Sequence, residues 1–130
     1  MPRFPIIRST VDALKPHLPE GFRIIVQYSG SDDSGWFDNE YFQTKDEKTI
    51  YINEKKPEPE AILQEFRIEI HNELYPLLYG RFPGWEIGCD EVRGSHGHFT
   101  IDSATNTITQ THIQDFCSEE DISPEEKETF

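Results

Sequence analysis

The pattern of hydrophobic and polar positions in the first half of the chain predicts β-strands. Residues 22–28 are mostly β-branched or aromatic, a composition typical of a strand. Residues 36–43 and 49–52 repeat this composition. The stretch 29–35 has no large apolar residue, and 45–48 is polar throughout. We therefore predict an antiparallel meander of about three strands, joined first by a loop and then by a hairpin turn.

The strongest helical signal follows the meander. Pro57 and Pro59 stand where the start of a helix tolerates proline. Apolar residues then recur every three or four positions, which is the spacing of one buried helix face. These residues are Ile62, Leu63, Phe66, Ile70, Leu74, Leu77 and Leu78. Pro76 lacks an amide hydrogen, so we expect this helix to kink or end near Tyr75.

A shorter helix is predicted at residues 9–18, near the start of the chain. Apolar residues recur there at helical spacing, and Ser9 or Thr10 is a candidate N-cap. Pro16 and the turn at 19–21 limit its length.

The last part of the chain returns to the strand pattern. Residues 99–102 and 107–113 predict two strands joined by a turn at 103–106, after a loop at 94–97. Strands before and after one long helix predict an α+β fold. We expect an antiparallel sheet of about five strands with the long helix packed on one face, plus the short N-terminal helix.

Composition and charge bound the organisation and the partners. The chain has 130 residues, with 12 Lys and Arg against 25 Asp and Glu, for a formal charge of −13. That length fits one domain. We place the domain at residues 1–116 and expect the acidic segment 117–130 to be a flexible tail. The acidity argues against nucleic-acid binding and against docking on an anionic membrane.

The absence of apolar runs predicts a cytoplasmic protein. No apolar stretch approaches 18 residues, and the first residues lack the pattern of a secretory signal. Cys89 and Cys117 are then expected to be free thiols in a reducing compartment. Because the edge strands of a small sheet must be covered, blunted or paired, the sequence leaves open a monomer or a weak homodimer.

The loop at 29–35 is the first candidate site. Asp32 and Asp33 are oxygen ligands of the kind that magnesium or calcium prefers, with Ser34 and Gly35 beside them. The loop lacks the pattern of a calcium-binding helix–loop–helix and that of a phosphate-binding loop. We therefore interpret it as a structural or recognition loop, and we predict no metal and no cofactor.

The histidines are the second candidate, as ligands or catalytic groups. If Ile101 faces Ile108 across the turn, His98 faces Thr111 and His96 faces Ile113. His112 then faces Gly97 and lies on the opposite side of the sheet from His96 and His98. This register works against a site of three histidines unless a bulge at 94–97 reorients the strand. The candidate catalytic residues are His96, His112 and Asp102.

Three further side chains have a structural interpretation. His71 falls at the edge of the apolar helix stripe, where a histidine packs its ring and forms a hydrogen bond with its tip. Trp36 and Trp85 are expected to be core or surface aromatics. Without interleaved basic residues they do not form a nucleic-acid surface.

Two regions together resemble a family of small, uncharacterised bacterial domains. The first is the segment Tyr28–Gly35 after a strand; the second comprises Gly84-Trp85-Glu86, then Gly97-x-Phe99-x-x-Asp102, then Ile108-x-x-x-His112. The resemblance spans about residues 22–116 and implies a single domain of no established activity. The matching positions are Asp32, Asp33, Ser34, Gly35, Trp85, Asp102 and His112. His98 and Gln110 depart from the family pattern, which tends to an acidic and an apolar residue there.

Three functions are compatible with these observations. The first is a non-enzymatic interaction or regulatory module that binds another protein, such as a basic one, because an acidic surface with aromatics suits such recognition. The second is a metal-assisted hydrolase that uses His96, His98 or His112 with a carboxylate. The third is a nucleic-acid mimic, which requires a one-sided stripe of carboxylates.

Overall fold

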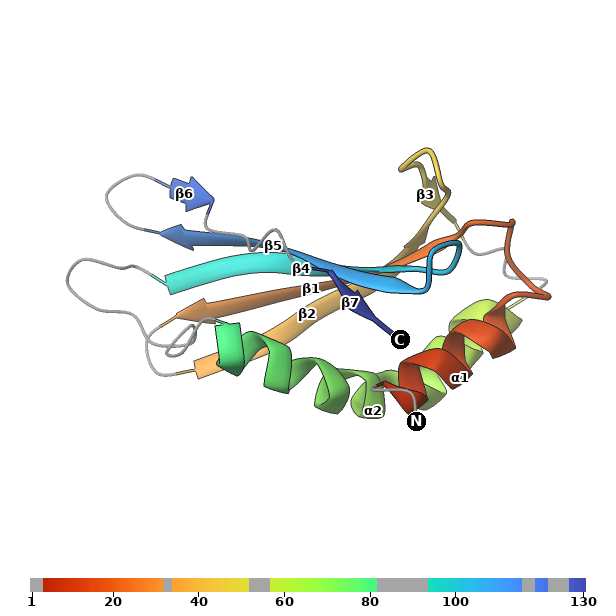
Figure 1. Cartoon of the computed structure of the whole chain (residues 1–130), viewed down its shortest axis with the longest axis horizontal. Helices are drawn as coiled ribbons and strands as arrows, with labels where there is room; N and C mark the ends of the chain where they lie inside the picture. Colours follow the sequence, from red (N-terminus) through yellow and green to blue (C-terminus); the bar gives the residue numbers. More distant parts are fainter. Residues whose placement is uncertain (1–3, 32–33, 52–56, 82–93, 116–118, 122–126) are drawn as a thin grey trace.

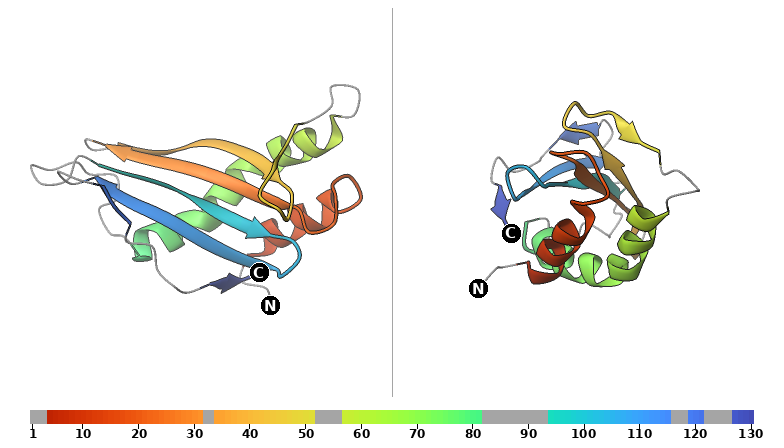
Figure 2. Two further views of the ribbon diagram at one scale, coloured as in Figure 1. Left: turned by 90° about the horizontal axis from the view of Figure 1, so that it is seen from above. Right: turned by 90° about the vertical axis from the view of Figure 1, so that its right-hand side faces the viewer.

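The computed structural model places an open antiparallel sheet above two helices (Figure 1). It describes residues 4–31, 34–51, 57–81, 94–115, 119–121 and 127–130. Both helices lie on the same face of the sheet, and the end-on view shows the sheet curving over them (Figure 2). The predicted α+β class, with a long helix on one face and a short N-terminal helix, is confirmed.

The described residues form two helices and seven strands. In chain order these are α1 (Pro5–Leu14), β1 (Arg23–Ser31), β2 (Ser34–Gln43), β3 (Thr49–Ile50), α2 (Glu58–Arg81), β4 (Gly94–Asp102), β5 (Thr107–Asp115), β6 (Glu119–Asp121) and β7 (Glu128–Thr129). The strand order across the sheet is β3-β2-β1-β4-β5-β6, and β7 also pairs with β5. Neither described helix combines the length and the apolarity needed to cross a membrane.

The core lies between the sheet and the helices because successive strand residues point to opposite faces. In β1, Ile24, Val26 and Tyr28 are all buried and belong to this core. Phe99 pairs with Val26 and Ile101 with Ile24, so β4 adds its apolar residues to the same face. The opposite face of β4 and β5 carries threonines and histidines, and no described helix covers it.

The long helix differs from the prediction in its length. Of the two predicted outcomes at Tyr75, a kink or an end, the end is wrong, because α2 continues through Pro76 to Arg81. Proline deprives the carbonyl of residue 72 of its usual donor, but Asn72 and Pro76 are both exposed, so water replaces the lost hydrogen bond. Leu77 and Leu78 are buried beyond the proline, and their packing favours continuation of the helix.

The short helix starts earlier than predicted, at Pro5 rather than near Ser9. Proline suits the first helical turn because its missing amide hydrogen would be unpaired there. Thr10 does not cap the helix, since its hydroxyl donates to the carbonyl of Ile6 within the helix. The cap comes from α2, where the Glu73 carboxylate accepts hydrogen bonds from the backbone amides of Ile6 and Ile7 at 2.9 and 2.8 Å.

Replacing Glu73 by glutamine is expected to lower the free energy of unfolding by about 1–2 kcal/mol. The amide side chain keeps one acceptor oxygen, turns an NH₂ group toward a backbone donor, and loses the charge that the helix dipole favours. Urea denaturation measures the change. Glu69→Gln, one turn earlier at an exposed position, is the matched control and should leave the midpoint unchanged. Equal midpoints for the two variants would contradict the capping role.

The β4–β5 hairpin has the predicted register. Ile101 pairs with Ile108, His98 with Thr111, His96 with Ile113, and Gly97 with His112. A turn occupies residues 103–106, where Asn106 adopts a positive φ of 56° that asparagine tolerates. The predicted loop at 94–97 is wrong, because β4 already begins at Gly94 and pairs with both β1 and β5 there.

The segment predicted as a loop between the first two strands is mostly strand. Ser29 pairs with Trp36, Gly30 with Gly35, and Ser31 with Ser34, so β1 and β2 continue almost to the tip of their hairpin. The absence of large apolar residues was misleading here, because this end of the hairpin needs only backbone pairing. Asp32 and Asp33 lie outside the described residues.

The C-terminal segment also departs from the expected flexible tail. Its described residues belong to the sheet, where β6 and β7 both pair with β5. The side chain of Phe130 is only 4% exposed and joins the core. In addition, Arg8 in α1 donates a hydrogen bond to the Phe130 carbonyl at 3.2 Å. One aromatic residue at the end of a polar segment therefore anchors it to the domain.

Candidate functional site

The candidate histidines do not converge. His112 lies on the helix-facing side of the sheet, where it is fully buried, whereas His96 and His98 lie on the open side and are half-buried. Burial lowers the pKa of His98 below its ordinary value. Within the described ranges, no three His, Cys, Asp or Glu residues gather closely enough to hold a metal ion. The separation follows from the strand register.

Asp102 has a structural role at the β4–β5 turn. One carboxylate oxygen accepts hydrogen bonds from the amides of Ala104 and Thr105, and the other lies 3.3 Å from Nε of Arg23. Asp102 and His98 both line a shallow cavity of about 450 Å³ over the open face of the sheet. Threonines make up much of its wall, and the Asp102 oxygens are already occupied by turn and arginine contacts.

His112 belongs to a buried hydrogen-bonded group beneath the sheet. The Gln110 side-chain amide donates to the Tyr28 hydroxyl at 2.9 Å, and that hydroxyl forms a hydrogen bond of 2.5 Å with Nδ1 of His112. Burial raises the pKa of Tyr28 far above its ordinary value, and the hydrogen bond from Gln110 offsets only part of that rise. Tyr28 is therefore neutral, and its hydroxyl links Gln110 to His112.

Gly97 makes room for this buried group. It pairs with Tyr28 on one side and with His112 on the other, so the tyrosine and histidine meet across a residue without a side chain. A Cβ at this position would lie 2.1 Å from the Thr111 carbonyl oxygen and 2.8 Å from the Tyr28 hydroxyl. The site thus accepts glycine alone, and its contacts indicate a packing role for His112.

A second buried polar group joins α2 to β2. The Glu40 carboxylate accepts hydrogen bonds from Nε of Arg67 at 3.0 Å and from Nε2 of His71. Burial by itself raises the pKa of the Glu40 carboxyl, but the hydrogen bonds and charges of His71 and Arg67 outweigh burial and hold the pKa below 4.5. The result is an ionised carboxylate at the interface between sheet and helix.

The predicted environment of His71 is confirmed. Its ring stacks on Phe37 with centroids 4.2 Å apart, and its tip bonds to Glu40, so the ring packs while the nitrogen stays paired. Tyr75, one turn later in α2, packs edge-to-face with the same phenylalanine, and their ring centroids are 5.0 Å apart. Sequence reasoning missed Glu40 and Arg67 as its partners, because nothing local shows which strand α2 crosses.

Of the remaining candidate residues, the structure describes only Ser34, Gly35 and Trp36. Ser34 and Gly35 belong to the β2 backbone, and Trp36 beside them is 43% exposed. Trp85, Cys89 and Cys117 lie outside the described residues.

The outer edge of β2 is a surface that sequence reasoning did not find. β2 pairs with β1 from Ser34 to Gln43, but on its other side the described chain pairs only at Phe42 and Gln43, through β3. A groove of about 340 Å³ runs beside this edge. Its lining comes from β2 (Asn39, Glu40, Tyr41, Phe42), from β3 and the next residue (Thr49, Ile50, Tyr51), and from α2 (Glu60, Leu63, Gln64).

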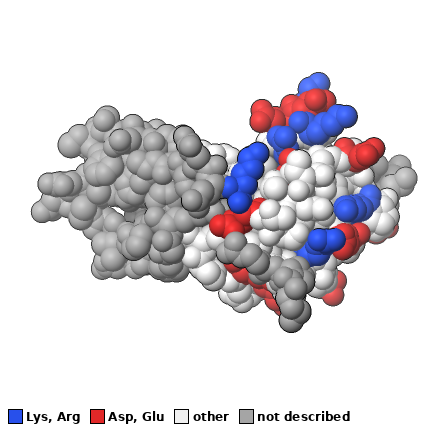
Figure 3. All heavy atoms as spheres, viewed as in Figure 1, with Lys and Arg blue, Asp and Glu red and all other residues white. Residues whose placement is uncertain are grey.

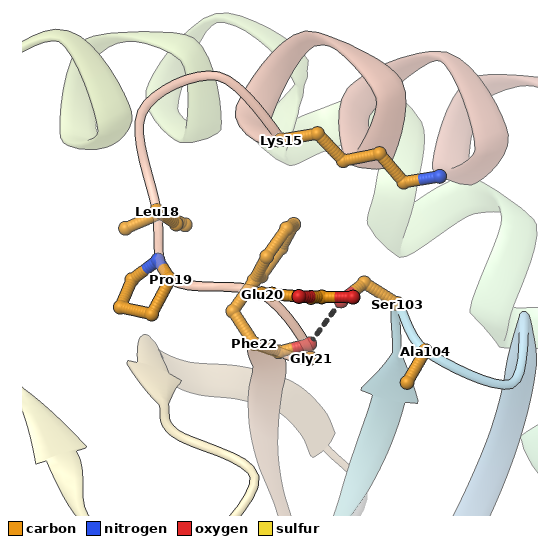
Figure 4. A pocket seen from close by; sticks show the side chains of 8 residues that line it. All are labelled: Lys15, Leu18, Pro19, Glu20, Gly21, Phe22, Ser103 and Ala104. Carbon is orange, nitrogen blue, oxygen red and sulfur yellow. Dashed lines mark hydrogen bonds between the residues drawn. The ribbon is translucent and has the colours of Figure 1, made fainter.

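A larger cavity of about 560 Å³ lies between the end of α1 and the β4–β5 turn (Figure 4). Leu18, Pro19 and Phe22 supply its large apolar side chains, and Lys15 and Glu20 supply its charged ones. The Ser103 hydroxyl is occupied by a hydrogen bond to the Phe22 carbonyl at 2.6 Å. No residue singled out from the sequence lines this cavity, and its charged residues are exposed.

The distribution of charge bears on nucleic-acid mimicry. On the face shown in Figure 3, the blue and red side chains of the described residues lie next to one another. Arg23, for example, lies between Glu47 and Asp102. A phosphate mimic requires a run of carboxylates without such cations, and the described residues on this face do not offer one.

The chain matches no protein-family model, no curated protein and no solved structure.

Proposed function

We propose that this chain is a protein-interaction module that binds a basic partner through the surface around β2. One observation carries the proposal. The large hydrophobic side chains that the described residues expose are Trp36, Tyr51 and Ile68, at 43%, 89% and 63%. Single exposed hydrophobics are ordinary, but these three flank the same strand. Trp36 is on β2, and Tyr51 follows β3 and lines the β2 groove.

Ile68 completes this surface from the helix side. It follows Gln64 by one turn of α2, and Gln64 lines the groove. Tyr75, a further two turns along, contacts Phe37 of β2, so this flank of α2 faces the strand. We call Trp36, Tyr51 and Ile68 the β2 patch. Its aromatics are of the kind that dominate binding energy at protein interfaces.

Charge supports a basic partner over a neutral one. The chain has 25 acidic and 12 basic residues, and the exposed carboxylates of Asp38 and Glu60 lie beside the β2 patch. Electrostatic attraction would steer a basic protein toward this surface and weaken as salt rises. The cytoplasmic location and the resemblance to small bacterial domains remain predictions that agree with such a role.

Affinity capture from the native host at low salt tests the proposal. Wild-type protein should retain a basic partner, and the double variant Trp36→Ala, Ile68→Ala should bind it at least about tenfold more weakly, as expected for interface anchors. Glu69→Ala is the control, since it alters an exposed residue next to Ile68 that points away from β2. Thermal unfolding verifies that each variant is folded.

Two results would overturn the proposal. One is a partner that binds the double variant as tightly as the wild-type protein. The other is the absence of any retained partner together with turnover of a substrate by the isolated chain.

A further inference from the structure

We propose that the partner contributes an extended, basic segment that pairs with the outer edge of β2 as an added strand, in the groove between β2 and α2. This inference rests on the proposed function and specifies its geometry. Strand addition at a free sheet edge, with a helix forming the other wall of the groove, is a recurring mode of peptide recognition.

The edge itself is the first support. From Gly35 to Tyr41, β2 is hydrogen-bonded to β1 but to no strand of the described chain on its outer side. A strand directs alternate backbone groups to each side, so this stretch presents amides and carbonyls outward over about 24 Å. Such an edge pairs readily with another chain.

Features of the same edge argue against a second copy as the occupant. Asp38 is exposed and lies at a β-bulge. Tyr28 of β1 pairs with Phe37 and Gln27 pairs with Asn39, so Asp38 has no opposite residue in β1. The Ser29 hydroxyl donates to the Asp38 carboxylate at 2.5 Å, which orients it. Two antiparallel copies of β2 would bring like charges together, and a charge at a bulged edge discourages self-pairing. A basic segment meets no such repulsion.

The groove provides contacts for both sets of side chains of an added strand. Because successive residues point to opposite faces, one set would point toward α2. It would meet Glu60 and Gln64, which line the groove, and Ile68, which follows Gln64 by one helical turn. The other set would point to the open face, where Trp36 and Asp38 lie next to Ser29. Each side thus offers one exposed carboxylate and one large hydrophobic. The matching segment therefore needs a basic and an apolar residue on each face, as in a repeat of two basic and two apolar residues.

Binding of a synthetic peptide tests this geometry directly. The probe is a labelled peptide of about nine residues in which pairs of lysines alternate with pairs of valines, so that each face carries both residue types and the peptide is long enough to cover the edge. We expect it to bind and to slow hydrogen exchange at the outward-facing amides between Gly35 and Tyr41, with no slowing in the open-face residues of β5. Two further peptides carry N-methyl groups on alternate backbone nitrogens, which removes the amide donors along one edge of the strand. The first peptide is methylated along one edge, and the second along the opposite edge. Only one of the two should lose binding, because an added strand pairs through a single edge.

A matched pair of protein variants tests the charge. Glu60 and Glu69 are exposed glutamates on α2, but only Glu60 lines the groove. Glu60→Lys should weaken peptide binding about fivefold, the scale of an exposed ion pair replaced by a repulsion, and Glu69→Lys should change it less than about twofold. Equal effects of both reversals, or equal binding of both methylated peptides, would overturn strand addition.

The outcomes separate this inference from the proposed function. A host partner that depends on Trp36 and Ile68 but leaves the β2 amides unprotected would preserve the interaction module and refute strand addition. Failure of the alternating peptide to bind refutes strand addition as well. Loss of both the host partner and the peptide would refute both proposals.

Discussion

Replacing Gly97 by alanine is expected to lower the free energy of unfolding by about 3 kcal/mol, at the upper end of the cost of overpacking a core. The added Cβ would lie 2.1 Å from the Thr111 carbonyl oxygen. That oxygen belongs to the backbone of β5, so relief requires the strand itself to move. The movement would also disturb the hydrogen bonds among Tyr28, Gln110 and His112.

Urea denaturation with circular dichroism measures this effect, and the midpoint should fall by about 1–2 M. Thr100→Ala, on the same strand but facing the open side, is the control and should shift the midpoint far less. Adding Tyr28→Phe to the Gly97→Ala protein removes the second close contact but leaves the first. The double variant should therefore not recover the wild-type midpoint. Full recovery would show that the tyrosine hydroxyl, rather than the β5 backbone, limits residue 97.

Replacing Glu40 by alanine is expected to cost about 2–3 kcal/mol of stability, somewhat less than the loss of one partner from a fully buried ion pair. The Glu40 side chain is only 5% exposed, and its removal leaves His71 and Arg67 without their shared acceptor. Arg67 is 36% exposed, so water compensates part of the loss. Glu40→Gln keeps one acceptor oxygen and should cost less. A cost below 0.5 kcal/mol for Glu40→Ala would show that the contact is incidental.

The same carboxylate gives stability a dependence on pH. Its pKa is lowered in the folded protein, so the unfolded chain takes up a proton first as the solution is acidified. The contribution is therefore present above about pH 4.5, the ordinary value, and is lost as pH falls through the lower pKa of the folded state. Midpoints of wild-type and Glu40→Gln protein, measured from pH 7 to pH 2, should converge on the acidic side. A constant difference would contradict the assignment.

Sequence alone predicted the parts of the fold that depend on local pattern. The β4–β5 register followed from placing Ile101 opposite Ile108, and it correctly separated His112 from His96 and His98. A shift of one residue in the β4–β5 pairing would have placed each β5 side chain on the opposite face of the sheet, so the apolar pattern determined where His112 lies. Likewise, the apolar spacing in α2 identified its buried face correctly at Leu63, Ile70 and Leu74.

The parts that sequence missed depend on contacts between distant segments. The start of α1 was misplaced because its cap is Glu73, which no local motif near Ile6 and Ile7 reveals. The β2 edge was missed for a related reason. The order of strands in the sheet decides which strand keeps an unpaired edge. That order is set by the pairing of β1 with β4, two strands that α2 separates in the sequence.

The anchoring of α1 has a consequence for the order of assembly. The capping carboxylate of α1 comes from Glu73, which lies 66 residues after Ile7 in the chain. Arg8 in the same helix donates a hydrogen bond to the carbonyl of Phe130, which lies 122 residues after it. Contacts across such separations form slowly, because long loops must close before the contacts stabilise anything. During synthesis, α1 leaves the ribosome before Glu73 and Phe130 do, so it cannot reach its final position until they have followed.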